Sequence, residues 1–458
     1  MDRQENPDGY IFPSDPHTLR NIDVQALECL DIGFQPAPGI APVLTFAIEG
    51  SHPIAKRWSQ VSDRVVELLD GAGITWVAIE CFRRRQQIRQ TYEDATIAIT
   101  VKDLPSNTDS LQAILCEIHN LSGGLFVEIR PGKIWPYASS APIPMPYSLQ
   151  TPMGGSVGTN ERPDCYGTIG GFVELFKGDD VKMCCLTSDH VVNPQPGTEL
   201  GDDSVRIFHP SSQDHGLSIS RIRQRILLLN EGLEEAREDV DEFGEADETT
   251  IRNISSDIKD AQIELNDVEN LDRYIGTLFA CSGSSVLCQD RRSDWAVIEL
   301  ESGSEGHNSY VSSSGKTKTL QAFRAPSKGC EVSKFGRTTG MTDGVINGVQ
   351  SLLHKVHKHQ PFRTNEWTVV PEHIRPYQPF VRGGGNGLRS DPLFAQGGDS
   401  GSFVTHRAHP EVIGMVLCGT DSYGSAFVSP IKQVAKQILA KTSFHVRLRD
   451  GPHICCDP

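Results

Sequence analysis

From residue 156 to residue 442 the apolar residues of this chain come in short runs that glycines interrupt. Runs of this kind include "YGTIGGFVELF", "VKMCCLTSDHVV" and "EVIGMVLCGT". Many short strands at such intervals, with turn residues between them, favour an all-β barrel or sandwich. This pattern constrains the fold more than any other feature, because it covers more than half of the 458 residues.

One acidic block inside this region does not have the pattern of a sheet. Residues 219–276, which include "RIRQRILLLNEGLEEAREDVDEF" and "TTIRNISSDIKDAQIELNDVENLDRYI", carry apolar residues at helical spacing. A Gly-Glu-Ala-Asp break separates the two halves, so we predict a helical hairpin inserted into the β domain. Its charged face is either a solvated surface or a docking surface for a protein partner.

The N-terminal third of the chain has a different pattern. Residues 41–133 contain strand-like and helical segments in the order β-α-β-β-α-β, which predicts a small α+β domain of the ferredoxin-like kind. Residues 1–40 are expected to be loosely ordered, and residues 134–155, rich in Pro, Ser and Gly, are expected to be a linker. The β domain then spans 156–442, and a C-terminal tail spans 443–458.

Charge and hydropathy exclude two kinds of partner. The net charge of -16 argues against nucleic acid and anionic membranes as partners, since phosphate contacts need clustered Lys and Arg. The N-terminus has no basic, apolar export signal, and no apolar run reaches the roughly 18 residues of a membrane span. We therefore expect a cytoplasmic protein whose twelve cysteines are mostly reduced thiols.

Three polar residues suit nucleophilic catalysis when they are taken together. Ser400 lies in "AQGGDSGSFV", His190 follows a strand in "CLTSDHVV", and Asp294 opens an apolar strand in "RSDWAVIEL". Each alone has a bland explanation as a turn residue, a structural histidine or a solvated carboxylate. A serine nucleophile, however, needs a histidine within hydrogen-bonding reach and a carboxylate that orients the imidazole.

The order His190, Asp294, Ser400 on short strands resembles that of the chymotrypsin-like (trypsin-like) serine peptidases. The motifs "TSDHV", "DWAVIEL" and "GGDSGS" carry the resemblance, which covers roughly residues 150–440. It implies a double β-barrel, an endopeptidase that acts on protein or peptide substrates through an acyl-enzyme, and no metal or other cofactor. His190 and Asp294 are 104 residues apart, farther than in the family, and the inserted hairpin accounts for the excess.

The resemblance also implies roles for single residues. Ser400 would attack the peptide carbonyl, His190 would move the proton, Asp294 would orient His190, and the backbone N–H groups of Gly398 and Ser400 would form the oxyanion hole. The residues that would line the primary substrate pocket are Phe394 at its floor, Leu417, Cys418, Gly419 and Gly424. With no acidic side chain at the floor, we expect a preference for a neutral apolar residue of modest size.

The chain departs from secreted animal members of that family in two ways. Val191 stands where they have a disulfide cysteine, and no basic activation site with a following Ile-Val-Gly-Gly is present. We therefore expect that the carboxylate of Asp399 is satisfied internally. Control of activity would come from the N-terminal domain or from the helical insertion, either of which could also bind a protein partner.

Three other interpretations compete with this one, and the third is rejected. The peptidase-like domain could be a latent or inactive scaffold that binds proteins, although all three triad residues are present. The histidines of "HKVHKH", His354, His357 and His359, could bind a metal, but their spacing defines no known site. "FGRTTGMTDG" lacks the Lys of a phosphate loop, so it is expected to be a β-hairpin with a structural Arg337.

Overall fold

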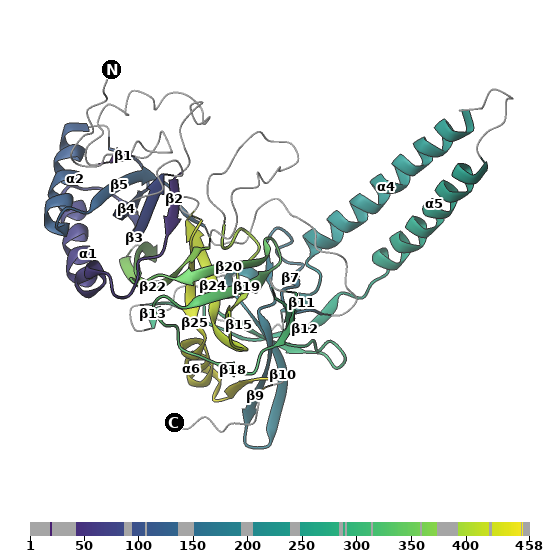
Figure 1. Cartoon of the computed structure of the whole chain (residues 1–458). Helices are drawn as coiled ribbons and strands as arrows, with labels where there is room; N and C mark the ends of the chain where they lie inside the picture. The colour runs from purple at the N-terminus through teal and green to yellow at the C-terminus, as the bar shows by residue number, and fades with distance from the viewer. Residues whose placement is uncertain are drawn as a thin grey trace.

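The computed structural model describes residues 19–20, 43–86, 94–105, 108–135, 151–193, 205–238, 248–283, 287–288, 291–312, 315–357, 360–372, 393–420, 424–449 and 451. Most regular structure in these residues is β-strand, arranged in an 8-stranded sheet, a 14-stranded sheet and two short ribbons. The strands of both large sheets are twisted (Figure 1), and clusters of buried apolar side chains form their cores. The ribbons pair Leu287–Cys288 (β13) with Arg291–Arg292 (β14), and Ser309–Val311 (β16) with Thr317–Thr319 (β17).

The 8-stranded sheet carries the segments that hold His190 and Asp294. Its order is β26-β9-β10-β15-β12-β11-β7-β8. β10 and β15 are antiparallel with Thr187 opposite Ala296, so the end of β10 lies beside the start of β15. The strands are Ser156–Gly158 (β7), Tyr166–Thr168 (β8), Gly171–Lys177 (β9), Asp180–Thr187 (β10), Arg206–Phe208 (β11), Tyr274–Cys281 (β12), Ala296–Leu300 (β15) and His445–Leu448 (β26).

The 14-stranded sheet holds the serine segment between two of its strands. Glu331–Gly336 (β19) and Gly340–Ile346 (β20) form a hairpin that closes at Gly336 opposite Gly340, which confirms the hairpin expected for "FGRTTGMTDG". The remaining strands of this part of the sheet are Ala322–Phe323 (β18), Ser351–His357 (β21), Gln360–Pro371 (β22), Phe403–His406 (β23), Glu411–Thr420 (β24) and Ala426–Pro430 (β25). The helix Ile431–Thr442 (α6) begins directly after β25, and the following β26 joins the other sheet beside β9, within the segment expected to be a tail.

The N-terminal strands have the expected element order but not the ferredoxin-like arrangement. Their order is β5-β4-β3, with β2 also on β3, and β4 and β5 are adjacent and parallel. A ferredoxin-like sheet separates the strands that each helix joins, so the prediction of that arrangement is wrong. The elements are Leu19–Arg20 (β1), Val43–Phe46 (β2), Pro53–Gly71 (α1), Trp76–Gln86 (β3), Asp94–Val101 (β4), Thr108–Ser122 (α2) and Phe126–Pro131 (β5).

One edge of β3 is shared between two partners. β2 pairs with residues 83–86, while β21 pairs with Ala78 and Ile79, so the N-terminal sheet continues into the sheet of the β domain. Asn347 strengthens this junction, since its side-chain amide donates to the carbonyl of Cys81 and accepts from the backbone N–H of Ile48. The two parts of the chain therefore meet through a continuous hydrogen-bonded sheet.

The segment expected to be a linker contains a short strand. Ile134–Trp135 (β6) pairs antiparallel with β24, with Trp135 opposite Gly419 and Ile134 opposite Thr420. Ile134 also packs against an apolar cluster that includes Leu417. The rest of this segment up to residue 150 lies outside the described residues, as do almost all of residues 1–40 and most of 443–458 beyond β26.

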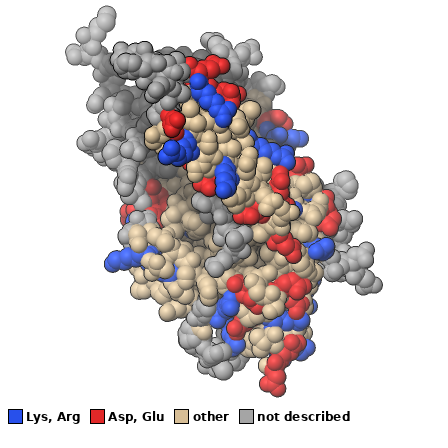
Figure 2. All heavy atoms as spheres, turned by 90° about the vertical axis from the view of Figure 1, so that its right-hand side faces the viewer, with Lys and Arg blue, Asp and Glu red and all other residues tan. Residues whose placement is uncertain are grey.

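Two long helices project from the β domain as an arm (Figure 1). They are Ser212–Glu238 (α4) and Glu248–Glu269 (α5), and ion pairs between Arg223 and Glu269 and between Arg225 and Glu264 join them. α4 begins seven residues before the predicted start at residue 219. In Figure 2, which views the molecule from the side of the arm, acidic and basic side chains are interspersed. None of the described helices has an apolar stretch of the length needed to cross a bilayer.

Candidate active site

His190 and Asp294 form a hydrogen-bonded pair at the adjoining ends of β10 and β15. His190 lies on the short helix Asp189–Val192 (α3), which follows β10, and Asp294 lies two residues before β15. The Nδ1 atom of His190 is 2.7 Å from Oδ2 of Asp294, and the backbone N–H of His190 donates to Oδ1 at 3.1 Å. Both oxygens of the carboxylate thus hold the histidine, and both side chains are buried.

A second cation, Arg292, shares the carboxylate of Asp294. Its Nη2 atom lies 3.3 Å from Oδ2, and its backbone N–H donates to the carboxylate of the buried Glu366 at 2.8 Å. Burial opposes ionisation of Asp294, but the electrostatic interaction with His190 and Arg292 and the hydrogen bonds from His190 outweigh it and hold the pKa of Asp294 well below its usual range. Asp294 is therefore a carboxylate at neutral pH, as an orienting group must be.

Ser400 lies in a sharp turn between β22 and β23 that packs against the turn of His190. Gly398 and Gly401 adopt φ values of +95° and +93°, which favour glycine. The Ser400 carbonyl accepts from the backbone N–H of Thr168 at 2.9 Å. A side chain at Gly401 would place its Cβ 3.0 Å from the backbone nitrogen of Ser188, two residues before His190. The serine turn and the histidine turn are therefore in direct contact.

Two polar atoms in this contact have no hydrogen-bond partner among the described residues. They are the Ser400 hydroxyl oxygen and the Nε2 atom of His190, and both are buried. Because Nδ1 faces a carboxylate, it carries the imidazole proton, which leaves Nε2 as an acceptor. The pair can take up a hydroxyl proton once a substrate brings the two atoms into line.

The backbone N–H groups of Gly398 and Ser400 also remain available. Neither donates to a residue in the part of the chain that the structure describes. Two such donors on one turn suit a negatively charged oxygen, because backbone N–H groups need no reorganisation when the charge forms. The sequence names the same two N–H groups for an oxyanion hole, and that role stays a prediction.

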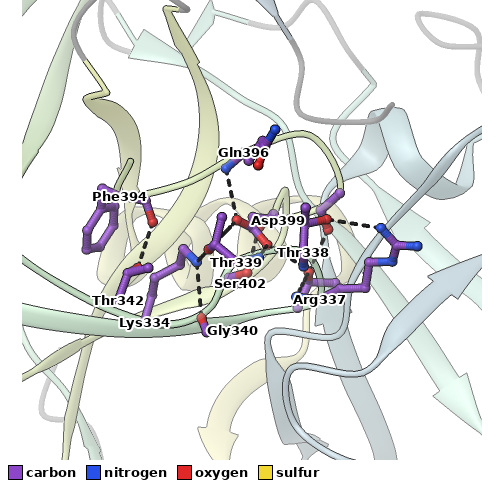
Figure 3. Close-up of polar contacts among 12 residues, drawn as sticks. Lys334, Arg337, Thr338, Thr339, Gly340, Thr342, Phe394, Gln396, Asp399 and Ser402 are labelled. Carbon is purple, nitrogen blue, oxygen red and sulfur yellow. Dashed lines mark hydrogen bonds and ion pairs between the residues drawn. The ribbon is translucent and has the colours of Figure 1, made fainter. Parts of the chain in front are cut away.

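Asp399 has several partners inside the protein (Figure 3). It forms an ion pair with Lys334 at 3.2 Å, and neither side chain is exposed. It also accepts from the backbone N–H groups of Thr338, Thr339 and Gln396 at 2.8, 3.2 and 2.9 Å. These contacts confirm the expectation that its carboxylate is satisfied internally, and they anchor the serine turn to the β19–β20 hairpin.

The structure brings some of the predicted pocket residues together and separates others. Phe394 is fully buried, and its backbone N–H donates to the carbonyl of Gly424 at 2.9 Å. Leu417 and Cys418 pack in a different cluster, with side chains that include Ala78 of β3, and Gly419 pairs with β6. Whether these residues line a substrate pocket stays a prediction.

Sequence reasoning missed several residues of the site. Arg292 is one, although two adjacent arginines shortly before Asp294 were a visible signal. Lys334, Thr168 and Thr338 are others, and no local pattern distinguishes them from ordinary strand or turn residues. Arg337, expected to be structural, is buried and binds Asp214 at the start of α4.

The histidine cluster has no metal-binding arrangement that can be described. His354 stacks on Trp76 with ring centroids 4.8 Å apart, while His359 lies outside the described residues. Within the described ranges, no group of three His, Cys, Asp or Glu side chains is placed to hold a metal ion.

No family model and no curated protein sequence matches this chain. Solved structures that resemble it include a glutamic acid specific serine protease, with a TM-score of 0.32 and 13% identity over 64% of this chain and 99% of that one. Protease A of Thermobifida fusca (TM-score 0.33, 13% identity, 65% and 99% covered) and a Cellulomonas bogoriensis chymotrypsin (0.31, 13%, 65% and 98%) are further examples. These neighbours are chymotrypsin-like serine proteases.

Proposed function

We propose that this protein is a serine endopeptidase with Ser400 as nucleophile, His190 as general base and Asp294 as the residue that orients His190. The observation that carries the proposal is the 2.7 Å contact from His190 Nδ1 to Asp294, with Nε2 and the Ser400 hydroxyl left buried and unpartnered among the described residues. Leaving polar atoms buried without partners costs roughly 1 to 3 kcal/mol each. Two such atoms, Ser400 Oγ and His190 Nε2, lie in turns that contact each other. A bound ligand would supply the hydrogen bonds that they lack.

The reaction follows from these positions. His190 Nε2 takes the proton of Ser400 as Oγ attacks the substrate carbonyl carbon, and Asp294 stabilises the imidazolium that results. The carbonyl oxygen becomes negative and receives hydrogen bonds from the N–H groups of Gly398 and Ser400. The proton passes to the leaving amine as the peptide bond breaks, which leaves an acyl group on Ser400. A water molecule, deprotonated by His190, then attacks the acyl carbonyl carbon. The bond to Oγ breaks, the acid is released, and His190 returns the proton to Ser400.

We expect an extended peptide to lie along the edge of β24 that begins beside Ser400. The backbone of Gly401 donates to the carbonyl of Val416, and Val416 donates to the carbonyl of Ser402, so this edge starts next to the nucleophile. Main-chain pairing along a strand edge is a common mode of peptide recognition. Phe394, Leu417, Cys418, Gly419 and Gly424 are proposed to form the primary pocket, with the preference for a neutral apolar residue given above.

Labelling with a fluorophosphonate probe tests the proposal, since such a probe reacts with an activated serine. We expect the wild type to be labelled and Ser400→Ala to be unlabelled. Ser220→Ala, on α4 and outside the site, is the matched control and should label like the wild type. A folded wild type that shows no Ser400-dependent labelling would contradict the proposal and would leave a protein-binding scaffold as the better description.

A further inference from the structure

We infer that three buried hydroxyl groups, those of Thr338, Thr168 and Ser402, position the oxyanion hole, and that Arg337 links this clamp to the base of the helical arm. The inference rests on the proposed peptidase function and names the residues that hold its oxyanion donors in place. The residues are positioning residues, since none of them is proposed to touch the substrate.

Three successive carbonyls of the serine turn each accept a hydrogen bond from one of these hydroxyls. Thr338 donates to Gly397 at 2.5 Å, Thr168 donates to Gly398 at 2.7 Å and Ser402 donates to Asp399 at 2.6 Å. All three hydroxyl-bearing residues are buried, the most exposed being Thr338 at 3%. A run of carbonyls held in this way leaves the backbone of the turn with one orientation.

That orientation determines where the oxyanion donors point. In a planar trans peptide group, the C=O of one residue and the N–H of the next point in opposite directions. The hydroxyl of Thr338 fixes the Gly397 carbonyl and therefore directs the N–H of Gly398 away from Thr338. In the same way, the hydroxyl of Ser402 fixes the Asp399 carbonyl and directs the N–H of Ser400 away from Ser402. These are the two N–H groups that have no partner among the described residues.

The absence of a side chain at Gly398 allows the hydroxyl of Thr338 to approach the serine turn. The φ of Gly398 is +95°, and a Cβ built on it would lie only 2.3 Å from the hydroxyl oxygen of Thr338. A side chain at this position would displace Thr338 from the carbonyl of Gly397. The glycine thus serves the close approach of the hydroxyl as well as the turn.

Arg337 extends the clamp to the first turn of α4. Its guanidinium binds both carboxylate oxygens of Asp214, with Nε 2.7 Å from Oδ2 and Nη2 also in contact with Oδ1. The Nη1 atom of Arg337 donates to the hydroxyl oxygen of Thr338 at 3.1 Å. The backbone N–H of Arg337 donates to the hydroxyl oxygen of Thr168 at 3.0 Å. The ring of Tyr166 lies 4.5 Å from the guanidinium carbon. Arg337 therefore contacts the arm and the hydroxyl of Thr338 through its guanidinium, and the hydroxyl of Thr168 through its backbone N–H.

Thr338→Val is the direct test, because valine keeps the shape and removes the hydroxyl. Phosphonylation of Ser400 by a fluorophosphonate and hydrolysis of p-nitrophenyl acetate both place an oxygen in the oxyanion hole. We expect both rates to fall by about 10²-fold, the size of effect seen when one oxyanion donor is lost. KM for the ester and the pH midpoint of the rate should not move, and Thr338→Ser should restore most of the rate. A merely structural defect would not give this pattern.

Asp214→Asn tests the link to the arm. We expect a rate loss of about tenfold, and the double variant Asp214→Asn/Thr338→Val should be no slower than Thr338→Val alone, because both changes act on one chain of contacts. Glu264→Gln is the matched control, since it removes an exposed ion pair of the same arm far from Asp214 and should leave the rate unchanged.

Amide hydrogen exchange over residues 394–403 gives a readout that needs no turnover. Exchange should be faster in Thr338→Val and Asp214→Asn than in the wild type and in Glu264→Gln. Unchanged exchange in both variants overturns the inference, whether or not the wild type reacts with the probe. An unreactive wild type with faster exchange in the variants would instead contradict the peptidase proposal and leave the clamp intact.

Discussion

The guanidinium of Arg292 lies 3.3 Å from Oδ2 of Asp294, the carboxylate oxygen that also faces Nδ1 of His190. Asp294 therefore has two buried cationic or potentially cationic neighbours, and Arg292 connects it to the buried carboxylate of Glu366. The proposed orienting residue thus belongs to a charge network as well as to a triad. Removing one member of the network should affect the stability of the whole site.

Arg292→Met keeps an apolar stem in place and removes the charge. It leaves the buried carboxylate of Asp294 with one cation fewer, so we expect the free energy of unfolding to fall by about 3 to 5 kcal/mol. Urea unfolding of the variant and the wild type at pH 7 measures this difference in the free energy of unfolding. Arg324→Met, which breaks a more exposed pair with Glu411, is the control and should unfold like the wild type. Equal midpoints for the two variants would show that the network does not stabilise the fold.

Lys334→Met should damage both stability and labelling, because it leaves the buried Asp399 carboxylate without its cation. We expect a loss of about 3 to 5 kcal/mol in the free energy of unfolding. The double variant Lys334→Met/Asp399→Leu should regain much of that stability while labelling of Ser400 stays low, since Asp399 also anchors the serine turn. Full labelling of the double variant would mean that the turn holds its shape without this carboxylate.

Glu366 should make stability depend on pH. Burial raises its pKa from the usual value to about 7, and its Oε2 atom has no partner among the described residues. A carboxyl group with a raised pKa favours the folded state most at low pH, and this contribution is lost as the pH rises through 7. Relative to Glu366→Gln, the wild type should therefore lose up to about 3 kcal/mol of stability between pH 5 and pH 8. Parallel stability curves for the two proteins would contradict the assignment.

Ile134→Asn should lower the KM for peptide substrates without changing the hydrolysis of small esters. The strand β6 already pairs with Gly419 and Thr420, at the far end of the edge on which we expect substrate to bind. Ile134 packs against the apolar cluster that includes Leu417, so a polar side chain there should loosen β6 and free this edge. We expect a severalfold lower KM for an octapeptide substrate and an unchanged rate with p-nitrophenyl acetate, compared in one preparation. An unchanged KM would show that β6 does not compete with peptides.

Local sequence patterns predicted the type of most secondary-structure elements correctly. The glycine-interrupted apolar runs around residues 166–187 and 411–420 are strands, and the spacing of the acidic block is helical. The start of α4 was missed by seven residues because a side chain decides it, since Ser211 accepts a hydrogen bond from the backbone N–H of Asp214 ahead of the periodic region. The N-terminal sheet was assigned the wrong arrangement because the order of strands depends on pairings between distant segments, such as β4 with β5 and β3 with β21, which local patterns do not show.

The sequence by itself determined most of the strands and helices, and it determined which residues have the chemistry of a nucleophile, a base and an acid. Those properties depend on the spacing of apolar side chains and on residue type, which are local. Only the tertiary structure decided that Arg292 shares the carboxylate of Asp294, that Lys334 neutralises Asp399, and that Asp214 reaches the serine turn through Arg337. The energy of a buried charge or hydroxyl depends on the groups that folding brings within about 3 Å of it, and most of those groups are distant in the chain.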